Sequence, residues 1–204
     1  MITALYTGTF DPVHYGHLDL MTRGAGLFEK LIVAVYDHKI PTKSLLFSVD
    51  ERVQMIEEAL KADRPDNIVV TSFSGLAVDF AHKMGAKVFV RGLRVFSDFE
   101  FEFRLALANK RLAPEIETIS LITHEDHTFL SGTTVREIAS LGGDVSSMVP
   151  PNVAEALYSR FNGRMTTHSI GRCHCVINHL TTIIFAVSVA NHREITIHFT
   201  KHFL

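Results

Sequence analysis

Short apolar runs alternate with longer mixed stretches along residues 2–162, and this alternation constrains the fold more than any other feature. The runs predicted to be strands cover residues 2–7, 31–36, 67–73, 87–92 and 118–123. The stretches predicted to be helices cover residues 16–28, 49–61, 75–84, 97–111, 133–141 and 151–162. Almost continuously apolar strands with helices between them are typical of parallel sheets covered on both faces. We therefore expect an α/β fold with a doubly wound, five-stranded parallel sheet and helices on both faces.

Several polar residues mark where the predicted helices begin and end. Three segments have the Ser/Thr-x-x-Glu spacing of a capping box: Ser48 with Glu51, Ser97 with Glu100, and Thr134 with Glu137. Gly85 and Gly142 stand where helices are expected to stop, because glycine tolerates the left-handed backbone of a helix end.

Composition excludes some classes of protein. The formal net charge is −2, without a long basic stretch, so a protein that binds duplex nucleic acid is not expected. The N-terminus lacks a basic segment followed by an apolar one, so we expect no secretory signal and no membrane association. Only two cysteines occur, Cys173 and Cys175, which rules out a disulfide framework. The expected location is the reducing cytoplasm.

The last forty residues differ from the rest of the chain. They contain half of the 12 histidines, both cysteines and a single acidic residue, Glu194. We interpret residues 1–163 as one domain and residues 164–204 as an extension of unknown role. Cys173 and Cys175 are closer together than the usual C-x2–4-C zinc spacing and no second pair follows, so a zinc site is not favoured.

Four predicted loops place polar groups after strands, at residues 8–17, 37–43, 91–94 and 127–136. In an open parallel sheet, ligands bind outside the carboxyl ends of the strands, near the point where strand order reverses. These loops offer cations, hydroxyl groups and the main-chain N–H groups of helix starts, all of which attract anions. The four loops together predict a site for a polyphosphate.

The segment GTFDPVHYGH, residues 8–17, adds two histidines at the start of a predicted helix. His14 and His17 are three residues apart, so both rings lie on the same helix face and can meet the same phosphate. Gly16 between them removes a side chain and would let a ligand approach the main chain. Imidazoles titrate near neutral pH and can supply a proton or positive charge to a phosphoryl group.

The motif G-T-F-D-P-x-H-x-G-H, with Ser131-Gly-Thr-Thr-Val-Arg136 further along, resembles the nucleotidylyltransferase superfamily. Within it, R-G-L-R at residues 91–94 and D-F-E-F-E-F at 98–103, followed by Asn109, look like the bacterial-type phosphopantetheine adenylyltransferases. The resemblance covers about residues 2–162. It implies a Rossmann-like fold and transfer of AMP from ATP to 4′-phosphopantetheine by direct in-line attack, giving dephospho-coenzyme A and pyrophosphate. It also implies Mg²⁺ with ATP, a homo-hexamer, and feedback binding of coenzyme A.

The same resemblance implies a set of site residues. The candidate catalytic residues are His17 at the α-phosphorus, Thr9 orienting the attacking phosphate, Lys43 and Arg91. Candidate ATP-binding residues are Thr9, Phe10, His17, Gly92, Leu93, Arg94, Glu102, His127, Thr128, Phe129, Leu130, Ser131, Gly132 and Thr133. Candidate residues for the acceptor are Thr9, Lys43, Leu76, Ala77 and Arg91. Lys39 competes with Lys43 as the main cation of its loop, and we expect no metal ligand among the protein side chains.

Two alternative functions stay open at this point. One is a related transferase with another phosphorylated acceptor, such as nicotinamide mononucleotide or glycerol 3-phosphate. The other is a regulatory module that binds a nucleotide without turnover. The R-G-L-R and D-F-E-F-E-F motifs speak against the first, and a histidine placed for a transition state speaks against the second.

Overall fold

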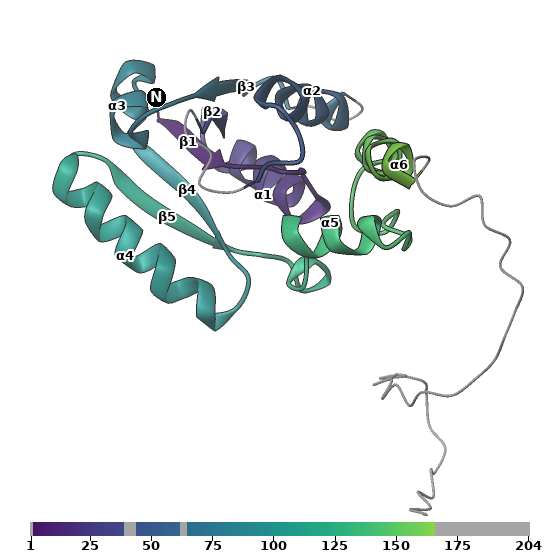
Figure 1. Cartoon of the computed structure of the whole chain (residues 1–204). Coiled ribbons are helices and arrows are strands. Elements are labelled where there is room, and N and C mark those ends of the chain that lie inside the picture. The colour runs from purple at the N-terminus through teal and green to yellow at the C-terminus, as the bar shows by residue number, and fades with distance from the viewer. Residues whose placement is uncertain (1, 39–43, 62–64, 166–204) are drawn as a thin grey trace, which may run out of the picture. The chain divides into compact units, whose positions relative to one another are not determined.

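Five parallel strands form the centre of the computed structural model, which describes residues 2–38, 44–61 and 65–165 (Figure 1). The strands are β1 (Thr3–Gly8), β2 (Lys30–Tyr36), β3 (Ile68–Phe73), β4 (Val88–Leu93) and β5 (Glu117–Ile122). Their order in the sheet is β3-β2-β1-β4-β5, and every neighbouring pair is parallel. The predicted five-stranded parallel sheet is confirmed. The chain builds the sheet outward from β1 in one direction and then in the other, so strand order reverses between β1 and β4.

Six α-helices and one 3₁₀ helix connect or follow the described strands. They are α1 (Tyr15–Leu27), α2 (Val49–Leu60), α3 (Ala77–Met84), α4 (Phe96–Leu112), η1 (Glu125–His127), α5 (Gly132–Ser140) and α6 (Pro151–Met165). None of the described helices is long and apolar enough to cross a membrane. Lys39, Lys43 and the whole segment 166–204, with Cys173 and Cys175, lie outside the described residues.

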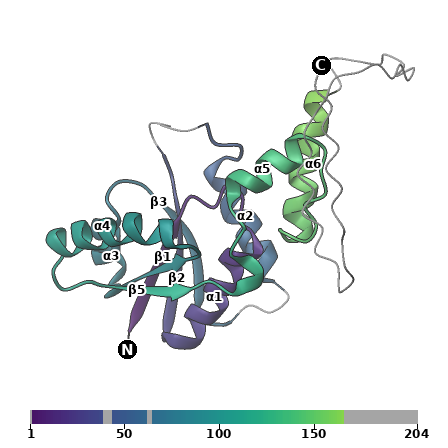
Figure 2. The ribbon, with the colours of Figure 1, turned by 90° about the horizontal axis from the view of Figure 1, so that it is seen from below.

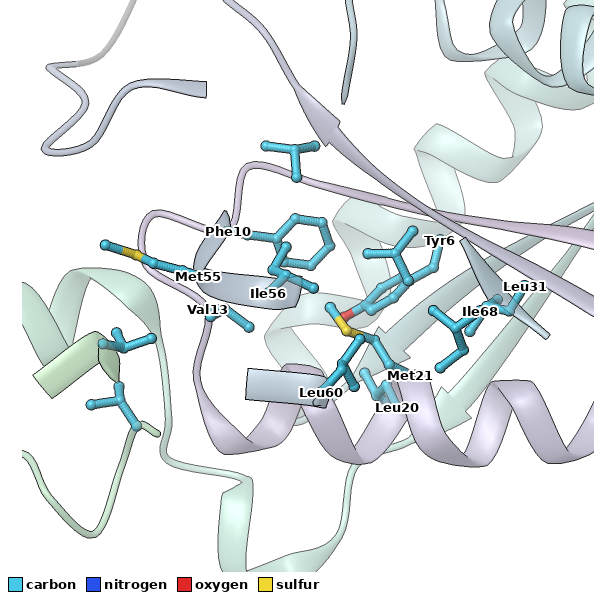
Figure 3. Close-up of a cluster of buried hydrophobic side chains, with 14 of the residues drawn as sticks. Tyr6, Phe10, Val13, Leu20, Met21, Leu31, Met55, Ile56, Leu60 and Ile68 are labelled. Carbon is cyan, nitrogen blue, oxygen red and sulfur yellow. The ribbon is translucent and has the colours of Figure 1, made fainter. Parts of the chain in front are cut away.

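Each face of the sheet carries its own apolar cluster, because successive side chains of a strand point to opposite faces. Ala4 and Tyr6 of β1 join a cluster with side chains of α1, α2, α5 and α6. Leu5, between them, joins a second cluster with side chains of α3 and of the segment that follows α4. Figure 2 shows α1, α2, α5 and α6 on one side of the sheet and α3 on the other. Figure 3 shows Tyr6 in the first cluster with Leu20 and Met21 of α1 and Leu60 of α2.

The residues predicted to begin and end helices are confirmed only in part. The capping box of Ser48 and Glu51 is present at α2, and Gly85 and Gly142 have the expected positive φ, 66° and 78°. The capping boxes predicted at Ser97 and Thr134 are wrong. Helix α4 begins before Ser97, after Val95, and helix α5 is capped by Ser131, whose hydroxyl accepts from the N–H of Thr134 at 3.1 Å. A hydroxyl caps the helix only if it precedes the first turn, and tertiary contacts set that turn.

The edge of the sheet beyond β4 differs from the prediction. Strand β5 was expected to be buried on both faces, but most of its side chains are exposed or half-buried. Phe99, Phe101 and Phe103 of α4 also lie outside the core, since all three are exposed. An apolar face therefore remains uncovered along α4 and β5.

Candidate active site

A pocket of about 380 Å³ opens at the carboxyl ends of β1 and β4, where the strand order reverses. Ligands of open parallel sheets bind at this position. Its walls come from these two strand ends, the first turns of α1 and α5, and the first turn and a half of α4. The lining residues are Tyr6, Thr7, Gly8, Phe10, His14, Gly16, His17, Leu20, Arg91, Gly92, Arg94, Asp98, Phe101, Glu102, Thr123, Ser131 and Gly132.

The loop between β1 and α1 folds back over the end of its own strand. Phe10 adopts the left-handed backbone, with φ 48°, and its buried ring packs edge-on against Tyr6 and His17 at centroid distances of 5.4 and 5.0 Å. A Cβ atom on Gly8 would lie 2.7 Å from the ring of Phe10, so this fold of the loop requires glycine at position 8. A side chain in the left-handed region costs about 1–2 kcal/mol, and such outliers concentrate at functional sites.

The two histidines of the loop stack on each other in the pocket wall. Their ring centroids are 3.6 Å apart and the planes are inclined by 21°. The N–H of His14 donates to Nδ1 of His17 at 3.3 Å. Nδ1 of a neutral His17 is therefore the acceptor nitrogen, and its Nε2 carries the hydrogen. His17 is thus oriented to donate a hydrogen bond to a ligand oxygen.

Both rings are held in the neutral form. Burial, with repulsion from Arg94 and His127, lowers the pKa of His14 to about 3. Burial also lowers the pKa of His17 well below its usual value, and His14, Arg94 and Arg91 lower it further. A phosphate group in the pocket would oppose part of this shift, because its negative charge favours the protonated form.

Gly16 lines the pocket, as its predicted role requires, and it also makes room for two side chains of the protein. A Cβ atom there would lie 3.2 Å from Nδ1 of His14 and 3.3 Å from Cβ of His127. The glycine thus makes room for the histidines of the protein itself. It brings His127 of η1 beside the start of α1, where its ring lies 6.4 Å from that of Tyr15.

Arg91 reaches the pocket from the end of β4 and is already paired. Its Nε and Nη2 donate to the two carboxylate oxygens of Glu102, both at 2.7 Å, and Nη1 donates to the carbonyl of Thr7 at 2.8 Å. The side chains of Arg91 and Glu102 are 19% and 13% exposed, so this is a partly buried, bidentate ion pair. The contacts fix the guanidinium plane of Arg91 between β1 and α4.

Arg94 has the same kind of support. Its Nε and Nη2 donate to Asp98 at 3.0 and 3.2 Å, and its Nη1 donates to the carbonyl of Leu130 at 2.5 Å. Arg94 thereby connects the start of α4 to the segment before α5, where Ser131 and Gly132 line the pocket. The side chain of Leu130 belongs to the core, so a ligand can meet only its main chain.

The structure brings eight of the 18 predicted site residues to this pocket. Phe10, His17, Arg91, Gly92, Arg94, Glu102, Ser131 and Gly132 line it directly. Thr9 lies between two lining residues. Leu76, Ala77, Leu93, Thr128, Phe129 and Thr133 do not line it, and Lys43 lies outside the described residues.

Some residues of the site escaped the sequence prediction. Asp98 pairs with Arg94 at 3.0 Å, but Arg94 precedes helix α4, so helical spacing gave no signal for this pair. Thr123 gave no signal. Its buried hydroxyl lines the pocket and has no hydrogen-bond partner within the described part of the chain. Within residues 2–38, 44–61 and 65–165, no group of three or more His, Cys, Asp or Glu side chains could hold a metal ion.

Comparison with known proteins agrees with this geometry. Residues 5–138 match the model of the cytidylyltransferase-like family. The chain is 50% identical over 161 residues to the phosphopantetheine adenylyltransferase of Heliobacterium modesticaldum, covering 79% of this chain and 94% of that protein. The enzyme of the same name from Dictyoglomus thermophilum is 48% identical over 161 residues, with 79% and 96% covered. A bifunctional NMN adenylyltransferase/ADP ribose pyrophosphatase from Francisella tularensis shares the fold, with a TM-score of 0.60, 18% identity, and 79% and 50% covered.

Proposed function

The chain belongs to the phosphopantetheine adenylyltransferases of the cytidylyltransferase-like family, and from this premise we propose how its residues act. It is a nucleotidyltransferase that transfers the adenylyl group of ATP to 4′-phosphopantetheine in coenzyme A biosynthesis. The products are dephospho-coenzyme A and pyrophosphate. The observation that carries the proposal is the neutral His17, oriented by His14 to donate from Nε2 in a pocket flanked by Arg91 and Arg94.

Both substrates carry phosphate, so their mutual repulsion must be reduced before one can attack the other. In the proposed reaction, a phosphate oxygen of phosphopantetheine attacks the α-phosphorus of ATP in line with the leaving pyrophosphate. The bond between the α-phosphorus and the bridging oxygen breaks as the new phosphorus–oxygen bond forms. Such a transfer needs positioned reactants and stabilised charge rather than a covalent enzyme intermediate.

His17 would donate its Nε2–H to an oxygen of the α-phosphate, where negative charge grows in the transition state. Thr9 would orient the attacking phosphate from the neighbouring position in the loop. The main-chain N–H groups at the start of α5, next to Ser131 and Gly132, would bind the remaining phosphates of ATP. These three groups come from the first and the last loop of the site, which the sheet brings together.

Arg91 and Arg94 would bind phosphate without moving, because their carboxylate partners already fix the guanidinium groups. Arg91 would bind the phosphate of phosphopantetheine. Gly92, Leu93 and Arg94 would contact ATP. Glu102 would contact the nucleotide while it stays paired with Arg91. Lys43, Leu76 and Ala77 would contact the acceptor outside the pocket, and His127, Thr128, Phe129, Leu130 and Thr133 would extend the ATP site.

Magnesium would enter as the counter-ion of ATP. The carboxylates nearest the pocket, Asp98 and Glu102, are bound to Arg94 and Arg91, so the described residues do not form a carboxylate site for a metal. Mg²⁺ retains several waters and binds readily through phosphate oxygens. Coenzyme A contains both the pantetheine arm and the adenylyl group, so it would compete for the same pocket as a feedback ligand.

We also propose that the chain forms a homo-hexamer through the exposed apolar face of α4 and β5. Its residues are Phe96, Phe99, Phe103 and Leu107 of α4 and Ile122 of β5, with exposed fractions between 49% and 91%. An apolar patch of this kind marks a protein interface. Light scattering should give six times the chain mass of 22.8 kDa, and Leu107→Glu should lower it. A monomeric wild-type protein would refute the assembly.

The domain comprising residues 1–163 should be sufficient for the reaction, because the relatives match about 161 residues and that match spans nearly their whole length. Residues 164–204 would then be an extension without a catalytic role. We place the enzyme in the cytoplasm, where ATP is available as its co-substrate.

The test is pyrophosphate release from ATP and Mg²⁺ with 4′-phosphopantetheine, and with nicotinamide mononucleotide and glycerol 3-phosphate as control acceptors. We expect pyrophosphate release from ATP with phosphopantetheine and with neither control acceptor. Release with a control acceptor alone would keep the reaction type and reject the substrate. ATP binding without release from any acceptor would reject the enzyme in favour of a nucleotide-binding module.

A further inference from the structure

Arg52 of α2 is a charged side chain in the core, with 1% of its surface exposed. Its guanidinium donates to four main-chain carbonyl oxygens. Nε donates to those of Phe47 and Ser48, both at 3.2 Å, and Nη1 donates to those of Thr9 at 2.6 Å and Tyr36 at 3.0 Å. A buried charge is tolerated only when it is hydrogen-bonded or paired. One side chain thus connects the ends of β1 and β2 with the start of α2.

The shortest of these contacts fixes a peptide of the active-site loop. The peptide between Thr9 and Phe10 is trans and planar, so its N–H points away from Arg52 when its carbonyl points toward it. Phe10 has the left-handed backbone, which a residue with a Cβ atom adopts unfavourably. External contacts are therefore needed to keep this peptide in place, and Arg52 supplies one.

Asp11 strengthens the same connection from the other side. Its buried carboxylate accepts from the main-chain N–H groups of Leu46 at 2.9 Å and Phe47 at 3.0 Å, and it pairs with Arg136 at 3.0 Å. Phe47 is thus held by its N–H through Asp11 and by its carbonyl through Arg52. The loop after β1 and the start of α2 are joined at two points.

We propose that Arg52 is a positioning residue for adenylyl transfer, which holds the Thr9–Phe10 peptide in the orientation that the reaction needs. The inference rests on the proposed function, since Thr9 and Phe10 are its ATP-binding residues. Arg52 does not line the pocket, so it acts through Thr9 and Phe10 and not on the substrate. Loss of its hydrogen bonds would let the peptide rotate and would displace both groups together.

A double-mutant cycle on the full chain tests this. Arg52→Gln, Thr9→Ala and the double variant are compared with wild type by kcat, by KM for both substrates, and by cooperative unfolding. We expect Arg52→Gln to lower kcat by about 10- to 100-fold, the scale of a small misplacement at a reacting centre. In the Thr9→Ala background, the same change should lower kcat by a clearly smaller factor, because the part of the loss that acts through the Thr9 side chain is already gone. If Arg52→Gln lowered kcat by the same factor with Thr9 and with Ala at position 9, the proposal would be overturned.

Arg160→Gln is the matched control. Arg160 also supports the start of α2, since it donates to the carbonyl of Leu46 at 2.9 Å, pairs with Glu51, and lies 5.0 Å from the centre of the Phe47 ring. Within the described part of the chain, Arg160 makes no hydrogen bond or ion pair with Thr9 or Phe10. Its kcat should stay within about threefold of wild type. A loss as large as that of Arg52→Gln would assign the effect to general loosening of α2 and overturn the proposal.

Two further arms keep the outcome decisive. If Arg52→Gln fails to fold, Arg52→Lys takes its place in the cycle, because lysine keeps the charge and loses the fork geometry. The same proteins are titrated with ATP by calorimetry. A wild type that binds ATP but lacks turnover would reject the proposed enzyme. Non-additive ATP affinities in the same cycle would then still support Arg52 as a positioning residue of the loop, and additive affinities would reject it. An active wild type with an additive cycle would reject Arg52 alone.

Discussion

Acid should destabilise the ligand-free protein through His14, and the size of the effect follows from its burial. Burial lowers the pKa of His14 from its usual value of 6.5 to about 3 in the folded chain. Between these two pH values the unfolded chain binds more protons than the folded one, so stability falls as the pH falls. Each pH unit well inside this window costs about 1.4 kcal/mol. Lowering the pH from 7 to 5 should therefore cost about 2 kcal/mol for His14 alone.

The pKa of His17 is lowered in the same direction, so its contribution adds to that of His14. The measurement is the free energy of unfolding from urea titrations at pH 7 and pH 5, without nucleotide, for wild type and His14→Asn. The variant should lose about 2 kcal/mol less than wild type between the two pH values, because its residue 14 cannot take up a proton. In a domain of this size, that difference corresponds to about 4–8 °C in Tm.

His82→Asn is the control for this experiment, because His82 lies at the surface beside Glu115 and away from the pocket. It should keep the acid sensitivity of wild type. If His14→Asn lost as much stability on acidification as wild type does, His14 would not be held neutral by its surroundings. The electrostatic description of the histidine pair would then be refuted.

Three further changes test other parts of the site. His17→Ala should lower kcat by about 10²- to 10³-fold while calorimetry shows little change in ATP affinity, because its hydrogen bond strengthens in the transition state; normal turnover would remove His17 from the mechanism. Glu102→Gln should lower the free energy of unfolding by about 1–3 kcal/mol, since Arg91 loses a bidentate carboxylate, and unchanged urea midpoints would show that the pair contributes nothing. A chain that ends at Met165, the last residue of α6, should keep wild-type kcat, and loss of activity would give the extension a role.

The strands and helices could be predicted from the sequence to within one or two residues at most ends. Their signals are local: apolar runs, glycines after helices, and Ser48 with Glu51 at a helix start. The position of the site was also predictable, because the carboxyl ends of parallel strands meet at one edge of the sheet. The prediction failed for the capping residues of α4 and α5, where Val95 and Ser131 precede the first turn in place of Ser97 and Thr134.

The sequence alone therefore determined the parallel α/β fold, the edge of the sheet where the candidate pocket lies, and His17 as a candidate residue. Only the tertiary structure decided what surrounds these groups. It pairs Arg91 with Glu102, stacks His14 on His17, and buries Arg52 against the carbonyl of Thr9, 43 positions away. Local patterns depend on neighbours within one or two turns of the chain. Burial and hydrogen bonding depend on segments that become neighbours only after the sheet has formed.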